Sequence, residues 1–127
     1  MENITIEETS KTPLIQFDTS NHTIRIEGKI IAENPLTFFG KLDEIIDNYA
    51  QDNKAHTLSL NVYVDYFNTV CTKYFLKFLR KVISSKEDSS KININWHYDA
   101  DDTEIKESGE DYAMILNHNF NFLEVKN

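Results

Sequence analysis

The segment Tyr66-Phe67-Asn68-Thr69 places a hydroxyl group at a junction that suits a chemical switch. It follows an alternating apolar run, which is typical of a strand, and it leads into a run with helical spacing. Ligands and partners of α/β sheets gather at the carboxyl ends of strands. Phosphorylation of a threonine there adds about −1.5 to −2 charges at a helix N-terminus, which tolerates an anion. Thr69 is therefore a candidate phosphoacceptor.

The same residues have a simpler interpretation as helix caps. Asn68 and Thr69 both belong to the residue types that cap helices, a role that contributes about 1 kcal/mol to helix stability. On local chemistry alone capping is favoured, because short motifs often match by chance.

The neighbours of Thr69 form a candidate partner-binding surface. An exposed aromatic ring at this junction is a candidate anchor for a partner, although core packing is an equally good interpretation for Phe67. The residues assigned to this surface are Tyr66, Phe67, Asn68, Thr72 and Lys73.

The acidic segment from Asp99 to Asp111 is a second candidate site. Its carboxylates lie close enough in sequence to suggest binding of Ca²⁺ or Mg²⁺. The spacing does not match an EF-hand loop, because no glycine follows Asp101 at the required position and Gly109 lies too far along. A solvated loop leading into a helix is the better interpretation, followed by docking to a basic partner. A divalent-metal-binding module is the least favoured alternative.

The remaining reactive side chains form no catalytic arrangement. Cys71, the single cysteine, falls in the first turn of a predicted helix, where a thiol pKa can be lowered, but no histidine is near it in sequence. The four histidines share no metal-ligand spacing: His22, His56, His97 and His118. We therefore expect no catalytic residue, no metal and no cofactor.

Patterns in the first half of the chain predict the elements that position these residues. Residues 13–17 and 23–27 flank a turn-rich stretch and predict a β-hairpin, with 3–8 as a candidate frayed strand before it. Asn34-Pro35 is typical of a helix start, and helical spacing continues to about Gln51.

The second half continues the alternation of strands and helices. Residues 57–65 predict a strand, a second helix follows from Asn68-Thr69 to about Ser85, and residues 91–98 predict another strand. Residues 112–117 predict a short helix, and residues 120–125 an extended end.

This order of elements predicts an α/β fold that borders on α+β. It favours a mixed sheet of four or five strands, with an N-terminal β-hairpin and two to three helices. The strands at 57–65 and 91–98 are expected to form a right-handed parallel crossover around the second helix. With 127 residues and no internal repeat, the chain is expected to be a single domain over residues 1–127.

Charge and composition restrict the partners. Thirteen basic and twenty-one acidic residues give a net charge of −8, which repels nucleic acids and anionic membranes and favours protein partners. The N-terminus lacks signal-peptide features, and no apolar run approaches the roughly 20 residues that cross a bilayer. A single cysteine suits a reducing compartment. We expect a cytoplasmic protein.

Several sequence pieces recur in a known order and spacing. They are Thr12-Pro13-x-Ile15-x-Phe17, Ile24-x-Ile26-x-Gly28-Lys29, Glu33-Asn34-Pro35, Phe38-Phe39-x-x-Leu42, Asp65-Tyr66-Phe67-Asn68-Thr69, Trp96-x-Tyr98 with Asp101-Asp102, and Gly109-Glu110-Asp111-Tyr112. Together they resemble the SiaC family of bacterial regulatory phosphoproteins over nearly the whole chain. The resemblance implies a STAS-like domain, similar to anti-sigma-factor antagonists.

The resemblance also implies a non-enzymatic signalling role. In this family the threonine that matches Thr69 is phosphorylated by a dedicated Ser/Thr kinase, and a PPM-type phosphatase removes the phosphate. The unphosphorylated form binds and activates a diguanylate cyclase, which promotes aggregation and biofilm growth. Val70 and Cys71 stand where the family usually has two serines, which leaves Thr69 and Thr72 as the nearby acceptors. A constitutive STAS-like adaptor without a phosphoswitch is the alternative.

Overall fold

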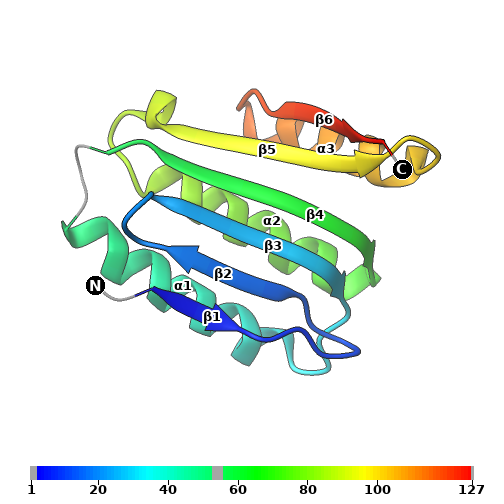
Figure 1. Ribbon diagram of the computed structural model, residues 1–127, viewed down its shortest axis with the longest axis horizontal. Helices are drawn as coiled ribbons and strands as arrows, with labels where there is room; N and C mark the ends of the chain where they lie inside the picture. The colour runs from blue at the N-terminus through cyan, green and yellow to red at the C-terminus, as the bar shows by residue number, and fades with distance from the viewer. Residues whose placement is uncertain (1–2, 53–55, 127) are drawn as a thin grey trace.

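The protein forms one six-stranded mixed β-sheet (Figure 1). The computed structural model describes residues 3–52 and 56–126. The spatial order of the strands is the same as their order in the chain. The first three strands pair antiparallel, whereas the third to the sixth pair parallel. The strands are β1 (Ile4–Ile6), β2 (Leu14–Asp18), β3 (Thr23–Ile30), β4 (Leu58–Phe67), β5 (Ile92–Asp99) and β6 (Asn121–Val125).

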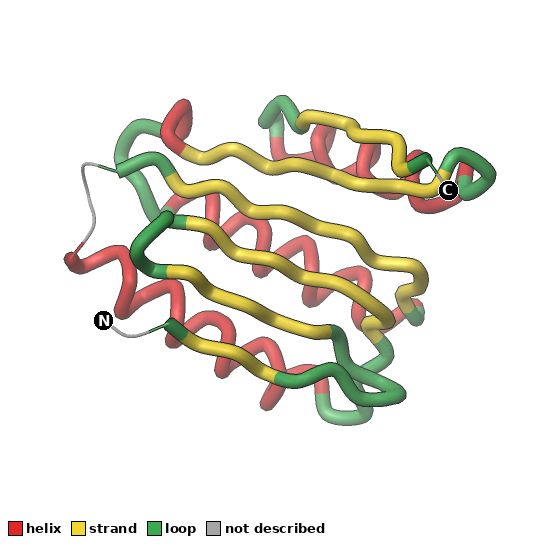
Figure 2. Tube along the Cα trace, in the orientation of Figure 1, coloured by secondary structure: helices red, strands yellow, loops and turns green. Residues whose placement is uncertain are grey.

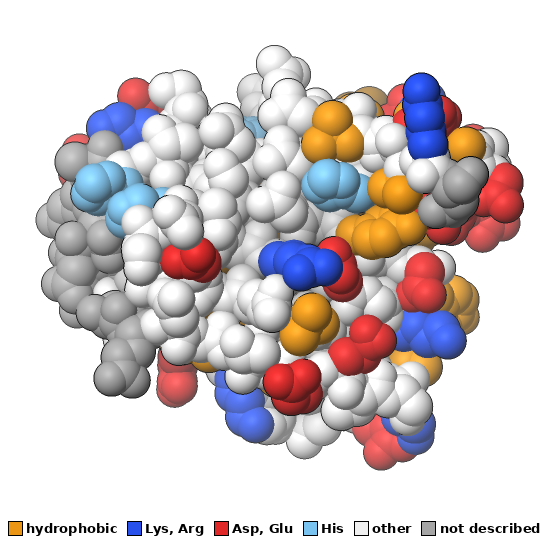
Figure 3. Space-filling view, in the orientation of Figure 1, with side chains coloured by type: hydrophobic (Ala, Val, Ile, Leu, Met, Phe, Trp, Pro, Cys, Tyr) orange, Lys and Arg blue, Asp and Glu red, His pale blue; other side chains and the backbone are white. Residues whose placement is uncertain are grey.

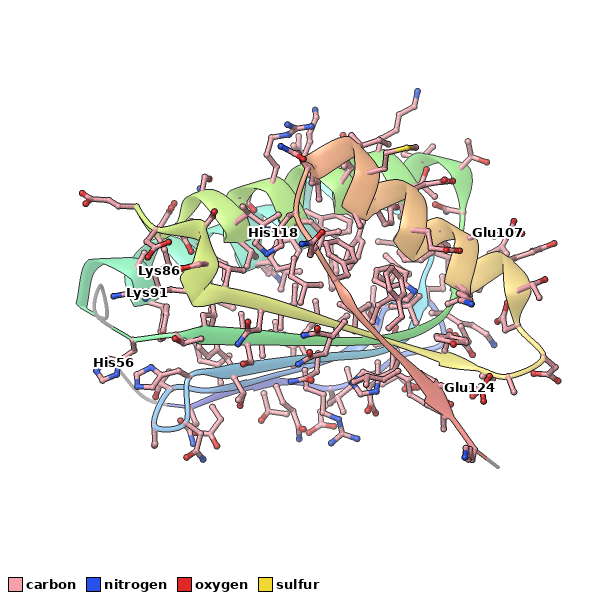
Figure 4. All side chains as sticks on the ribbon, turned by 90° about the horizontal axis from the view of Figure 1, so that it is seen from above. His56, Lys86, Lys91, Glu107, His118 and Glu124 are labelled. Atoms are coloured by element: carbon pink, nitrogen blue, oxygen red, sulfur yellow. The ribbon has the colours of Figure 1, made fainter. Side chains whose placement is uncertain are left out.

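Three helices pack on one face of the sheet and leave the other face uncovered in the described part of the chain (Figures 2 and 4). They are α1 (Pro35–Asp52), α2 (Thr69–Ser84) and α3 (Thr103–Leu116), and a 3₁₀ turn, η1 (Ser89–Lys91), precedes β5. Parallel strands need such crossover connections, because the chain must return to the same edge before each new strand. All three helices therefore begin at the edge where β3, β4 and β5 end.

Alternating side chains of the strands and the apolar stripes of α1 and α2 form the core. Branched residues of β4 and β5 point toward the helices, and their polar neighbours point to the uncovered face. The largest fully buried side chains are Trp96, Tyr49, Phe17, Phe75, Ile15, Ile26, Ile30, Ile46, Leu58, Leu60, Leu79 and Ile94.

Helix α3 is held against β5 by a close contact with Trp96. The indole Nε1 donates a hydrogen bond to the carbonyl oxygen of Ile105 at 2.9 Å. Gly109 lies over the same ring, and a Cβ atom placed on it would lie 2.6 Å from Trp96 Cε2. Because real Cβ atoms do not approach other atoms so closely, glycine at this position lets the helix rest directly on the indole.

The sequence predictions of a mixed α/β fold, an N-terminal hairpin, α1 and α2 are confirmed. The segment predicted at 3–8 is the short strand β1. The strand predicted to end at Asp65 continues to Phe67, because a bulge after Gly28, whose φ is 116°, lets Tyr66 and Phe67 pair with the end of β3.

Three expectations need correction. The sheet has six strands and not four or five, because residues 121–125 form a parallel strand and not just an extended end. The short helix predicted at 112–117 begins at Thr103, since Asp102 caps it. The acidic segment therefore lies mostly on a helix.

No helix in the described ranges combines the length and apolar character that crossing a bilayer requires.

Candidate functional site

Thr69 is the first residue of α2, and its side chain is exposed. Asn68 performs the capping: its Oδ1 accepts a hydrogen bond from the backbone N–H of Cys71 at 2.9 Å. The backbone N–H of Asn68 in turn donates to the carbonyl of Ile30 at 3.3 Å, which ties the cap to the end of β3. The two capping candidates therefore have different roles, and the Thr69 hydroxyl is available for chemistry.

This division of roles predicts different outcomes for two neighbouring alanine substitutions. Asn68→Ala is expected to lower the free energy of unfolding by about 1 kcal/mol, because the cap is lost. Thr69→Ala is expected to change it by less than about 0.5 kcal/mol, as is usual for exposed positions. Urea unfolding of both variants would measure the difference. A larger loss for Thr69→Ala than for Asn68→Ala would mean that Thr69 is the structural residue.

Thr72, the other hydroxyl near this helix start, is engaged within the fold. Its Oγ1 donates to the carbonyl of Thr69 at 2.6 Å, and its side chain is half-buried. Its own carbonyl accepts a hydrogen bond from the Tyr112 hydroxyl of α3 at 2.9 Å. Burial raises the pKa of this phenol. Tyr112 therefore stays a neutral donor that fixes the first turn of α2.

The predicted partner surface divides into exposed and packed residues. Tyr66 is 53% exposed and Val70 is 55% exposed, and Lys73 is exposed one turn further along α2. Phe67 is half-buried, with its ring centroid 5.2 Å from that of Phe75 and stacked on Trp96 at 6.4 Å. Core packing is therefore the main role of Phe67, which leaves Tyr66 as the exposed aromatic ring.

A cavity of about 200 Å³ lies between the start of α2 and the start of α3. Three carboxylates line it, those of Asp65, Asp102 and Glu104. Asp102 is the N-cap of α3, since its Oδ1 accepts from the N–H of Ile105 at 3.1 Å. Glu104 lies in the first turn, where a negative charge is favourable. The full lining consists of Asp65, Tyr66, Phe67, Thr72, Asp102, Glu104, Ile105 and Ser108.

The remaining candidates for chemistry lie apart from this junction. Cys71 is fully buried beside the carbonyl of Ala32, and burial raises its thiol pKa, which is the opposite of what a reactive thiol needs. His97 lies on the uncovered face near Tyr63. Within residues 3–52 and 56–126, no three His, Cys, Asp or Glu side chains are grouped as a metal site requires.

Comparison with known proteins connects this geometry to a family. The sequence profile of the "SiaC family regulatory phosphoprotein" matches residues 6–125. The chain belongs to the SiaC family. The match includes the whole β4–α2 junction and the whole of α3.

Two solved structures share the architecture of this SiaC family member, and a further relative resembles it in sequence. Apo-SiaC from Pseudomonas aeruginosa superimposes with a TM-score of 0.81 at 23% identity, covering 99% of this chain and 100% of that one. A chain from the complex of the diguanylate cyclase SiaD with its activator SiaC, also from P. aeruginosa, gives 0.85 at 22% identity, covering 96% and 99%. An uncharacterized protein of P. aeruginosa strain UCBPP-PA14 is 24% identical over 112 residues, 88% of each chain.

Sequence reasoning missed the contribution of α3 to the SiaC-family junction. Tyr112 holds the first turn of α2, and Asp102 and Glu104 line the cavity beside it. Asp102 and Tyr112 belong to motifs that carried the resemblance, Asp101-Asp102 and Gly109-Glu110-Asp111-Tyr112, whereas Glu104 lies between them. Their spacing alone does not reveal that the third helix folds back onto the start of the second.

Proposed function

We propose that this protein is a non-enzymatic, phosphorylation-controlled interaction switch and that Thr69 is its phosphoacceptor. The observation that carries the proposal is the exposed Thr69 hydroxyl at a helix start that Asn68 already caps. A phosphate can be added there without loss of a structural hydrogen bond. Membership of a family of regulatory phosphoproteins supports the same role.

The proposed cycle has two enzymes and one output. A cognate cytoplasmic Ser/Thr kinase transfers the γ-phosphoryl group of ATP to Thr69 Oγ1, releasing ADP and a proton. A PPM-type phosphatase hydrolyses the phosphothreonine with water and restores the hydroxyl. The unphosphorylated form binds and activates a partner such as a diguanylate cyclase, with control of aggregation and biofilm formation as the result. The relative SiaC, described as the activator of SiaD, motivates this choice of partner.

Electrostatics explains how one phosphate would change docking without unfolding the domain. The backbone N–H groups of a first helical turn lack partners within the helix and tolerate a negative charge. On the outside, the phosphate would add about −1.5 to −2 charges to the β4–α2 junction, whose residues Tyr66, Phe67 and Thr72 line a cavity with three carboxylates. The fold is thus retained while the surface around Tyr66 becomes strongly anionic.

Phosphorylation mapping tests the acceptor directly. Incubation with the cognate kinase and ATP, followed by mass spectrometry, is expected to place the phosphate on Thr69. Thr69→Ala should abolish labelling, Thr69→Ser should retain it, and Thr72→Ala should leave it unchanged. The measurement is the phosphorylated fraction of each variant over time.

Thr103 provides a matched control for this experiment. It is the first residue of α3, is exposed, and follows a capping residue, as Thr69 does. Thr103→Ala should leave labelling unchanged, because the proposal assigns the kinase site to the α2 junction. Unchanged labelling of Thr69→Ala would reject Thr69 as acceptor and favour a constitutive adaptor.

A further inference from the structure

β6 forms a free edge of the sheet, with no strand beyond it in the described part of the chain (Figure 1). An edge strand presents backbone N–H and C=O groups without sheet partners, and proteins usually protect such edges with charges, prolines or bulges. β6 contains one charged residue, Glu124, and no proline, and Leu123 is 43% exposed. Its backbone is therefore open to pairing with another strand.

A hollow of about 450 Å³ lies beside the start of β6. Among the described residues that line it there is no carboxylate, lysine or arginine, although 27% of the chain is charged. Its polar groups are amides and hydroxyls, plus the His118 ring, whose Nε2 lies 2.9 Å from the carbonyl oxygen of Ile92. Figure 4 labels His118 between the end of α3 and the sheet. The lining consists of Ser89, Ser90, Ile92, Asn93, Asn117, His118, Asn119 and Asn121.

A ladder of amide side chains runs along the uncovered face from β4 to this edge. Asn121 Nδ2 donates to Asn95 Oδ1 at 3.0 Å, and Asn95 Nδ2 donates to Asn61 Oδ1 at 3.0 Å. The three residues are in register on β6, β5 and β4. Asparagine is disfavoured in strands, so three asparagines at adjacent positions lower the stability of the sheet locally. Figure 3 shows that uncharged surface predominates across this face.

We propose that β6 and the amide-lined hollow form a docking site for an extended, uncharged segment of a partner protein. The segment would add as a seventh strand beside β6, and an Asn, Gln, Ser or Thr side chain would continue the ladder from Asn121. Strand addition obtains affinity from backbone hydrogen bonds and specificity from side-chain pockets. The site is separate from Thr69, because it lies where β5 and β6 begin and Thr69 follows the end of β4.

The chemistry of the site selects this occupant. The lining of the hollow offers no ion partner to a charged peptide, and the one charged residue of β6, Glu124, lies toward the other end of the strand. The amides of the hollow can both donate to and accept from neutral polar groups. Pairing of β6 with β6 of a second copy would bring together two chains of net charge −8 each, which repel one another. A saccharide would fill the hollow and leave the backbone of the edge unpaired.

Selection from a phage library of random eight-residue peptides, using the full chain as bait, tests the proposal. Selected peptides are expected to be uncharged and rich in Asn, Gln, Ser or Thr. A synthetic copy of one should slow amide hydrogen exchange across residues 121–125 by about tenfold or more. Asn121→Ala and Asn93→Ala should each weaken its binding by about tenfold. Asn48→Ala, an exposed amide on α1, is the matched control and should bind normally.

Each other outcome overturns the proposal. Selection of charged peptides, or protection elsewhere than β6, would mean that another surface binds. Failure to select any peptide would reject strand addition. Self-association of the chain in sedimentation experiments, together with slowed exchange at residues 121–125, would assign the edge to a second copy and would also overturn the proposal. Asn93→Ala retains the ladder, since its side chain forms no hydrogen bond within the described ranges, so a folding defect of Asn121→Ala cannot hide the result. Because Thr69 is remote, phosphorylation mapping is unaffected by either outcome.

Discussion

Phosphorylation of Thr69 is expected to weaken the complex with a diguanylate cyclase partner by about a hundredfold, equivalent to about 2.7 kcal/mol. The phosphate would project from the first turn of α2 next to Tyr66, the exposed aromatic ring at the junction. A partner that docks over the phosphate must desolvate about two negative charges. The phosphate and the carboxylates of the neighbouring cavity would also repel an acidic surface on the partner. Titration calorimetry with unmodified and fully phosphorylated protein would measure the two dissociation constants.

Two controls separate this electrostatic effect from loss of structure. The phosphorylated chain should unfold at nearly the same urea concentration as the unmodified chain, because the cap at Asn68 is retained. Glu104→Gln, which removes one cavity carboxylate, should reduce the penalty of phosphorylation without removing it. Equal affinity of the two forms for the cyclase would refute the switch, even if Thr69 proved to be phosphorylated.

Gly109→Ala is expected to destabilise the fold by about 1–3 kcal/mol. The added methyl group would lie 2.6 Å from an indole that is fully buried and hydrogen-bonded to Ile105, so neither partner can move away freely. This steric cost must exceed the gain of about 1 kcal/mol that alanine brings to a helix interior. Because α3 also carries Tyr112, displacement of the helix should loosen the first turn of α2. Urea unfolding and amide exchange at residues 69–72 would show both effects.

Gly40 provides the matched control, since it is also a glycine within a helix. A Cβ atom at Gly40 meets no atom within 4 Å, so Gly40→Ala should stabilise the protein by about 0.5–1 kcal/mol. The two identical substitutions are therefore expected to change the free energy of unfolding in opposite directions. Stabilisation by Gly109→Ala would show that α3 does not depend on the close contact with Trp96.

The sequence was sufficient to predict the features that depend only on residues close together in the chain. Asn34-Pro35 marks the start of α1, and alternation in β4 and β5 predicts strands with one buried face, because these signals depend on neighbours in the chain. The same is true of the helix that begins at Thr69. Which of Asn68 and Thr69 caps it could not be decided, since both side chains can accept the hydrogen bond and only the backbone geometry selects one.

Features that depend on distant residues could not be predicted. The run Glu104–Glu110 is strongly acidic and looks like a solvated loop, yet it forms a helix because Ile105, Gly109 and Tyr112 face the aromatic core. Tertiary packing thus overrides a weak local signal. β6 was similarly missed as a strand, because its five residues become one only by pairing with β5.

The strands lie in the sheet in the same order as in the chain, and this has a consequence for folding during synthesis on the ribosome. Every strand pairs only with strands adjacent to it in sequence, so the sheet can grow outward as the chain emerges, without waiting for a distant segment. Thr69 leaves the ribosome well before Tyr112, whose hydroxyl completes the first turn of α2. A nascent chain would consequently expose the proposed acceptor threonine in a looser helix start until Tyr112 has folded onto α2.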